Sequence, residues 1–264
     1  MAHDLRRVEQ VMGLPITIAV RSGEGQAGLV DEVYGWLRWV DATFSTYKKD
    51  SDISRIERGE LAAEKAHPMV RTVLRQAAAL AQSTHGYFDL RAGGRLDPSG
   101  YVKGWAVQMA SDLLLARGAY DHCVNAGGDI RACGTTAVPG TDRRRPWRIA
   151  IQDPWRQDLL RWVVSGDDLA VATSGTYARG AHVLDPHTGR PAADLASVTV
   201  VGPDLAPADA YATAALAMGE RAYDWLAELD GFESAVIDAR GRTWQSAGWP
   251  CHDEPVRLLE GVRP

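Results

Sequence analysis

Residues 122–133 read HCVNAGGDIRAC, and this stretch gives the clearest indication of the fold. Two short segments, 122–125 and 130–133, flank the pair Gly127-Gly128. Adjacent glycines permit either a sharp hairpin turn or a close approach of the backbone to a ligand, and both interpretations are open. In either case the stretch predicts two successive strands joined by a tight connection.

Outward from this stretch, the chain separates into strand-like and helical regions. Trp147, Ile149 and Ile151 alternate with other residues, which predicts a half-buried strand. Further strands are expected at residues 16–20, 159–164, 169–172, 197–201 and 234–237. Helices are expected at residues 29–40 and 68–83, from Lys103 to before Gly118, at 207–218, and once more before the last strand. The polar segment 45–58 predicts a loop with a short turn.

This order of elements predicts an α+β fold, with a largely antiparallel sheet core and packed helices, rather than a doubly wound sheet. The length of 264 residues allows one domain over residues 1–264, or two interleaved subdomains.

Composition excludes several classes of protein. A net charge of −5 gives no general attraction to nucleic acid, and the triplet at 143–145 is interpreted as a solvated loop. Three cysteines without CxxC spacing predict neither a disulfide framework nor a zinc site, which fits a reducing cytoplasm. No apolar run approaches the roughly 18 residues of a membrane helix, and no signal peptide is recognised. We therefore expect a cytoplasmic protein with no membrane span.

Residues 96–105, LDPSGYVKGW, are the first candidate for chemistry. Asp97 enters a Pro/Gly turn, and Lys103 follows at the start of a helical run. A lysine beside a helix N-terminus suits a phosphate-bearing ligand, although a solvated lysine after an ordinary turn is equally open.

Three later places in the chain carry oxygen-rich or titratable side chains. Residues 173–175, Thr-Ser-Gly, can bind an anion or the edge of a flavin. His182 is either a general base, since the reference pKa of histidine lies near neutrality, or a structural or exposed histidine. Asp209 and Thr213 are four residues apart, on one face of a helical first turn, and suit Mg²⁺; alternatively Asp209 is a first-turn acid.

The segment Tyr87-Phe88-Asp89 either holds a planar ring or enters the core as a strand. Taken in order, all these segments, with Met12-Gly13 and residues 44–54 before them, resemble the FAD:protein FMN transferases, the ApbE family. The resemblance covers most of the chain and implies an ApbE-like architecture related to the T-fold.

The resemblance also implies roles for individual residues. Contacts to FAD are implied for Met12, Tyr47, Tyr87, Phe88, Asp89, Asp97 and Lys103, and we expect Thr173, Ser174 and Gly175 at the FAD as well. Mg²⁺ ligands are implied to be the side chains of Asp209 and Thr213 and the backbone carbonyls of Gly100 and Ala212. His182 matches the family's proposed catalytic histidine.

The implied reaction transfers FMN from FAD to a Ser or Thr hydroxyl of an acceptor protein and releases AMP. The acceptors of the family carry a motif resembling Asp-x-x-Ser/Thr-Gly-Ala-Ser/Thr, which is absent from this chain's own Ser-Gly pairs. An FAD pyrophosphatase and a non-catalytic FAD-binding protein are the alternatives. Two departures from the family are the short connection between Asp89 and Asp97 and the presence of Gln108 where many members have an acid.

Overall fold

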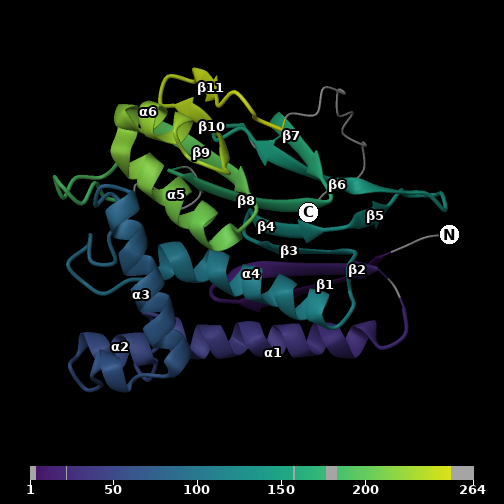
Figure 1. Cartoon of the computed structure of the whole chain (residues 1–264), viewed down its shortest axis with the longest axis horizontal. Helices are drawn as coiled ribbons and strands as arrows, with labels where there is room; N and C mark the ends of the chain where they lie inside the picture. Colours follow the sequence, from purple (N-terminus) through teal and green to yellow (C-terminus); the bar gives the residue numbers. More distant parts are fainter. Residues whose placement is uncertain (1–3, 22, 157, 177–182, 251–264) are drawn as a thin grey trace.

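The computed structural model describes residues 4–21, 23–156, 158–176 and 183–250. Helices cover one face of a large sheet, and a smaller sheet covers part of the other face (Figure 1). The strands in the described residues are β1 (Asp4–Val11), β2 (Leu14–Arg21), β3 (His122–Ala126), β4 (Asp129–Cys133), β5 (Thr135–Ala137), β6 (Arg144–Gln152), β7 (Leu160–Gly166), β8 (Asp168–Gly175), β9 (Leu195–Gly202), β10 (Glu233–Asp238) and β11 (Thr243–Gln245). The helices are α1 (Gln26–Phe44), α2 (Asp52–Glu57), α3 (Pro68–Ser83), α4 (Ser99–Ala116), α5 (Leu205–Met218) and α6 (Ala222–Ala227), with 3₁₀ turns η1 (Ala63–Lys65) and η2 (Gly219–Arg221).

The large sheet has the order β1-β2-β3-β4-β8-β9-β10-β11, and its neighbouring strands are antiparallel. The stretch HCVNAGGDIRAC forms the β3–β4 hairpin, in which Ala126 lies opposite Asp129. Gly127 and Gly128 form its two-residue turn with φ of 63° and 103°, a conformation that favours glycine. The hairpin interpretation is therefore confirmed, and the turn delivers Asp129 to the first position of β4.

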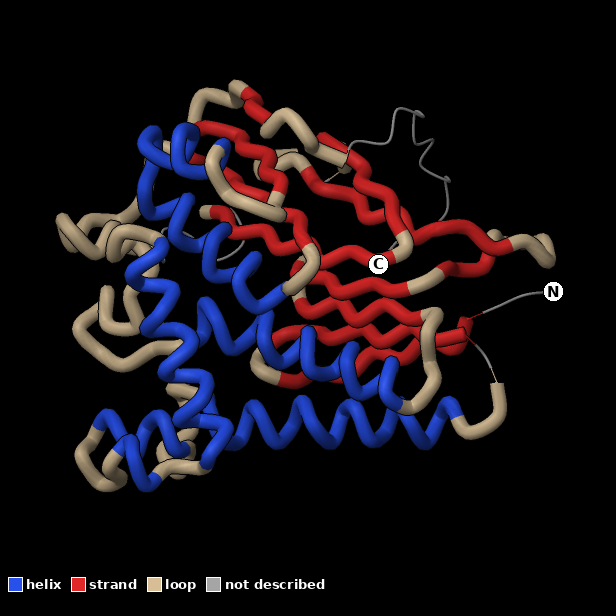
Figure 2. Tube along the Cα trace, viewed as in Figure 1, coloured by secondary structure: helices blue, strands red, loops and turns tan. Residues whose placement is uncertain are grey.

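Alternating side chains give the sheet two apolar faces. On β8, Ala170 and Ala172 pack into a core shared with α1, α4 and α5. Leu169 and Val171 point the other way, into a second core that includes Trp162 of β7. The three-stranded sheet β5-β6-β7 supplies this second layer. Figure 2 shows the helices gathered on one side of the strands, so the central strands are covered on both faces.

Several local expectations are wrong. The helix expected after Lys103 begins at Ser99, because Pro98 has the fixed φ that suits a helix N-terminus. Lys103 therefore lies one turn inside α4 rather than at its start. Residues 52–57 of the expected loop form the helix α2, whose N-cap Ser51 accepts a hydrogen bond from Ser54 N–H at 3.1 Å.

The basic triplet at 143–145 is only partly a solvated loop, because β6 begins at Arg144. The guanidinium of Arg144 lies 3.1 Å from Asp4 Oδ1 and 3.5 Å from Asp121 Oδ2. These two acids explain why an arginine is placed in the sheet. The strands β1, β5 and β11 were not expected from the sequence either.

No helix in the described residues is both long enough and apolar enough to cross a membrane.

Candidate active site

A buried cluster of Lys103, Asp129 and Asp209, called here the lysine cluster, lies where α4, β4 and α5 meet. Lys103 Nζ lies 3.1 Å from Asp209 Oδ1 and forms a second ion pair with Asp129 Oδ2. The side chains of Asp129 and Asp209 are only 1% and 3% exposed, whereas that of Lys103 is 23% exposed. Carboxylates buried this deeply need a charged or hydrogen-bonding partner. The lysine supplies that partner while its side chain stays accessible to solvent.

Backbone N–H groups fix the other oxygen of each carboxylate. Thr173 on β8 donates its N–H to Asp129 Oδ1 at 3.0 Å, and Gly104 on α4 donates its N–H to Asp209 Oδ2 at 2.9 Å. Hydrogen bonds to a carboxylate are among the stronger ones in proteins. Sheet and helix backbone therefore hold the two acids, and the flexible lysine bridges them.

A close crossing of α4 and α5 makes this arrangement possible. A Cβ atom on Gly104 would lie 2.5 Å from the carbonyl oxygen of Leu205 and 2.7 Å from Asp209 Cβ. Real Cβ atoms do not approach other atoms so closely, so the crossing requires glycine at this position. The glycine brings the α4 backbone within hydrogen-bonding reach of the Asp209 carboxylate.

Two hydroxyl groups lie on the same side of the sheet. Ser174 Oγ and Thr213 Oγ1 are 3.1 Å apart, and a Cβ on Gly100 would lie 3.6 Å from Thr213 Oγ1 and 3.2 Å from the Phe88 ring. Asp209 and Thr213 do share a helix face, as expected. They lie beyond the first turn of α5, however, because the helix begins at Leu205.

The expected magnesium ligands form an oxygen-rich set. The Gly104 N–H, one turn after Gly100 on α4, donates to the carboxylate of Asp209. No three His, Cys, Asp or Glu side chains among the described residues are grouped to hold a metal. One carboxylate with hydroxyl and carbonyl oxygens fits Mg²⁺, which keeps several waters or phosphate oxygens as its other ligands.

The segment 173–175 contributes unequally to this face. Alternation along β8 directs Ser174 toward α5, where it meets Thr213. Thr173 Oγ1 instead hydrogen-bonds Thr199 Oγ1 of β9 at 2.9 Å, on the opposite face of the sheet. Thr173 therefore contributes through its backbone N–H to Asp129 rather than through its hydroxyl.

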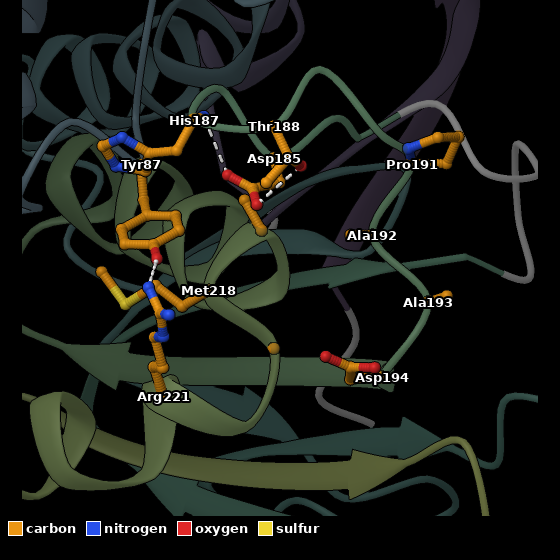
Figure 3. Close-up of a pocket in the computed structure, with 12 residues that line it drawn as sticks. Tyr87, Asp185, His187, Thr188, Pro191, Ala192, Ala193, Asp194, Met218 and Arg221 are labelled. Carbon is orange, nitrogen blue, oxygen red and sulfur yellow. Dashed lines mark hydrogen bonds between the residues drawn. The ribbon is translucent and has the colours of Figure 1, made fainter.

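A pocket of about 290 Å³ lies beside the end of α5 (Figure 3). Three segments line this pocket, which we call the aromatic pocket: Tyr87 after α3, residues 185–194 before β9, and residues 217–221 at the end of α5 and in the 3₁₀ turn η2. Arg221 donates a hydrogen bond of 2.8 Å to the Tyr87 hydroxyl, and the Tyr87 and His187 rings meet edge to face at 4.5 Å. Aromatic walls with a guanidinium at one end suit a planar, polar ring.

A tight turn shapes the upper wall of this pocket in Figure 3. Asp185 Oδ1 accepts the His187 N–H at 2.9 Å, and Asp185 Oδ2 accepts the Thr188 hydroxyl at 2.9 Å. Burial raises the pKa of Asp185, but these hydrogen bonds together outweigh that effect, so its pKa is below the ordinary value. The carboxylate therefore stays ionised and holds the turn, and His187 Nε2 reaches the His85 carbonyl at 3.0 Å.

The remaining expected residues are more dispersed. Met12 lies in the β1–β2 turn with φ of 54° and packs on the helix-side core, while Tyr47 is 98% exposed. Asp89 and Asp97 are exposed and accept backbone N–H groups two residues later, at 2.9 and 3.0 Å. Phe88 is buried, but its segment is not a strand. His182 lies outside the described residues.

The structure also places two residues at the site that the sequence did not single out. Asp129 was interpreted only as part of a turn, although its place directly after a glycine pair was a usable signal. Arg221 follows α5 and reaches Tyr87 across 134 positions of the chain. No local pattern could have indicated that contact.

The sequence matches the profile of the ApbE family over residues 12–94 and 90–236. The chain belongs to the ApbE family. A relative from Vibrio cholerae, named FAD:protein FMN transferase, is 28% identical, with 74% of this chain and 76% of the relative aligned.

Other members of the family with the same name align over less of their length. One from Rhodobacter capsulatus is 37% identical, with 50% of this chain and 25% of the relative aligned. One from Salmonella typhimurium is 30% identical, with 57% of this chain and 45% of the relative aligned. The chain therefore spans a quarter to three quarters of these relatives.

Solved structures of the family have the same fold. The flavin transferase ApbE from Vibrio cholerae superposes with a TM-score of 0.81 at 26% identity, covering 94% of this chain and 98% of that one. The ApbE protein from Thermotoga maritima gives 0.78 at 22% identity, covering 94% and 97%. The expected family and the α+β architecture are confirmed, and the expected enzyme class, a transferase, agrees with the names of these relatives.

Proposed function

We propose that the protein transfers FMN from FAD to a Ser or Thr hydroxyl of an acceptor protein and releases AMP, with Mg²⁺ as its metal. The observation that carries this proposal is the lysine cluster beside the hydroxyls of Ser174 and Thr213. It combines an anchored carboxylate for a metal with an accessible ammonium for a phosphate. The names of the family's relatives support the same activity.

The metal would be held by Asp209 and Thr213 through their side chains and by Gly100 and Ala212 through their carbonyls. When bound, Mg²⁺ neutralises charge on the phosphates and on the leaving group. This donor set supports magnesium over zinc or copper, because it contains no thiolate or imidazole.

The protein's own groups bind and orient the nucleotide. Lys103 supplies a point charge to the pyrophosphate, and the aromatic pocket accepts one ring system of FAD against the Tyr87 and His187 wall. Met218 lies five residues after Thr213 on α5, so the pocket begins about 7.5 Å along the helix from that hydroxyl. A ring in the pocket can therefore remain linked to phosphates at the lysine cluster.

In the proposed transfer, the acceptor's hydroxyl oxygen bonds to the phosphorus of the FMN half. The bond between that phosphorus and the bridging oxygen breaks, and the oxygen leaves with AMP. His182, on the family resemblance, takes the hydroxyl proton. We also propose, on the family resemblance, that FAD is contacted by Met12, Tyr47, Asp89 and Asp97.

Hydrolysis of FAD uses the same site, with water in place of the acceptor hydroxyl. A single incubation separates the possibilities: the protein, FAD, Mg²⁺ and an acceptor carrying the motif Asp-x-x-Ser/Thr-Gly-Ala-Ser/Thr, followed by mass spectrometry of the acceptor. A mass increase of one FMN supports transfer. AMP without that increase supports a pyrophosphatase, and binding without AMP supports a non-catalytic FAD-binding protein.

We further propose that the acceptor is met in the cytoplasm. The cysteine usage supports a reducing compartment, since Cys123 and Cys133 are free thiols.

A further inference from the structure

We infer that Asp129 is a positioning residue for Lys103. Without metal, the Lys103 ammonium pairs with both Asp129 and Asp209. Metal bound at Asp209 displaces the ammonium from that carboxylate, so that it stays paired with Asp129 and moves toward the nucleotide phosphates. The inference rests on the proposed function and deepens it. It predicts that metal and FAD strengthen each other's binding through this one lysine.

The contacts of Asp129 are the first support. The side chain is 1% exposed, its Oδ2 pairs with Lys103, and its Oδ1 accepts the Thr173 N–H at 3.0 Å. Asp129 is thus anchored to β8 and holds the lysine from the sheet side. Asp209 holds the same ammonium from α5, at 3.1 Å. The lysine is shared by one acid expected to bind metal and one acid not expected to do so.

Charge balance is the second support. Two carboxylates and one ammonium carry a combined charge of −1, which attracts a cation. A divalent ion on Asp209 would repel an ammonium that lies 3.1 Å from the same carboxylate. Lys103 can move because it has a flexible four-carbon stem and is 23% exposed. Asp129 cannot follow, so it remains the fixed end of the pair.

Reciprocity follows from these two points. Metal binding must displace Lys103 from Asp209, and phosphates attract the displaced ammonium. If bound metal raises the affinity for FAD by some factor, bound FAD must raise the affinity for the metal by the same factor. Without Asp129, the lysine pairs more strongly with Asp209 and competes more strongly with the metal.

Metal binding to the nucleotide-free protein tests this directly, with Mn²⁺ as the probe in titration calorimetry. Lys103→Met removes the competing charge, and we expect tighter Mn²⁺ binding by about tenfold. Asp129→Asn keeps the acceptor for the Thr173 N–H but removes the charge, and we expect weaker binding by about tenfold. Loss of affinity in both variants would overturn the inference.

The double variant distinguishes positioning from direct coordination. If Asp129 acts through Lys103, adding Asp129→Asn to Lys103→Met changes Mn²⁺ affinity by no more than about twofold. An equal loss in both backgrounds would mean that Asp129 acts on the metal itself, and the inference would be wrong. Asp153→Asn is the matched control: Asp153 is also 1% exposed and paired, with Arg161 at 2.6 Å, and it should leave Mn²⁺ affinity unchanged.

FAD binding, followed by quenching of flavin fluorescence, completes the test. In the wild type Mn²⁺ should tighten FAD binding about tenfold, and in Lys103→Met this gain should be clearly smaller. An undiminished gain in Lys103→Met would contradict the inference. The calorimetric arm uses neither FAD nor acceptor, so a wild type that fails to bind FAD or transfer FMN would refute the proposed function without altering that result.

Discussion

The backbone N–H of Gly104 on α4 donates a 2.9 Å hydrogen bond to the carboxylate of Asp209 on α5. This bond joins the two helices whose residues make up most of the expected metal site. It exists because residue 104 has no side chain to separate the helices.

Gly104→Ala is therefore expected to destabilise the protein and to disturb the site. The added methyl group would lie within 2.7 Å of Asp209 Cβ, so the helices must move apart. Overpacking of this kind costs about 1–3 kcal/mol, which urea denaturation measures. Gly35→Ala on α1 is the control, since no atom lies within 4 Å of its new Cβ and alanine is the better helix former. An equal response of the two variants would contradict the role assigned to the crossing.

Thr213→Val should weaken Mg²⁺ binding by about tenfold or more while preserving the shape of the side chain. The substitution removes the Oγ1 that lies 3.1 Å from Ser174. Calorimetric titration with Mg²⁺ measures the effect, and Thr213→Ser should restore binding. Thr199→Val makes the same change in a threonine on the opposite face of the sheet and should leave the affinity intact. If Thr213→Val also leaves it intact, the hydroxyl is not a ligand.

Tyr87→Phe and Arg221→Met should each raise KM for FAD about threefold to tenfold with little change in kcat. Both remove the 2.8 Å hydrogen bond that fixes the end wall of the aromatic pocket. The effect is modest because Arg221 is exposed and solvent screens its charge. Combining the substitutions should add little, since either one breaks the bond. A fully additive double variant would show that the two residues act separately.

The fully buried His122 predicts a pH dependence of stability. Its Nδ1 donates to the Ala119 carbonyl at 2.7 Å, so its Nε2 accepts the Ser111 hydroxyl at 2.7 Å. Burial lowers the pKa of His122 below its ordinary value of 6.5, and the nearby Arg131 lowers it further. The unfolded chain therefore takes up the proton first, and stability falls as pH drops below about 6.5.

Urea denaturation at pH 7.5 and pH 5.5 measures this loss of unfolding free energy. His122→Gln removes the titrating group, so the variant should lose less free energy between the two pH values than the wild type. Equal losses in both proteins would mean that His122 is not the responsible group.

Much of the fold could be predicted from the sequence, because local signals define it. The β3–β4 hairpin follows from two adjacent glycines, and α3 follows from its apolar periodicity, with both ends at the expected residues. The start of α4 was misplaced because a Pro/Gly turn and a helix N-terminus have the same residues. Short edge strands such as β5 and β11 carry too few residues for a pattern to be recognised.

The candidate site was less accessible to such reasoning. The spacing of Asp209 and Thr213 predicted their common face, whereas the pairing of Lys103 with Asp129 depends on how α4 crosses the sheet. The Arg221–Tyr87 contact likewise depends on the whole fold. Long-range packing, rather than any local motif, decides which charges meet.

The most direct test of the proposed function compares wild type with Asp209→Asn in the incubation with FAD, Mg²⁺ and the motif-bearing acceptor. The acceptor's mass and the released AMP are measured in the same sample. We predict that the wild type attaches one FMN for each AMP released, and that Asp209→Asn loses both products together. AMP release by the wild type without a gain in acceptor mass, or unchanged transfer by Asp209→Asn, would contradict the account.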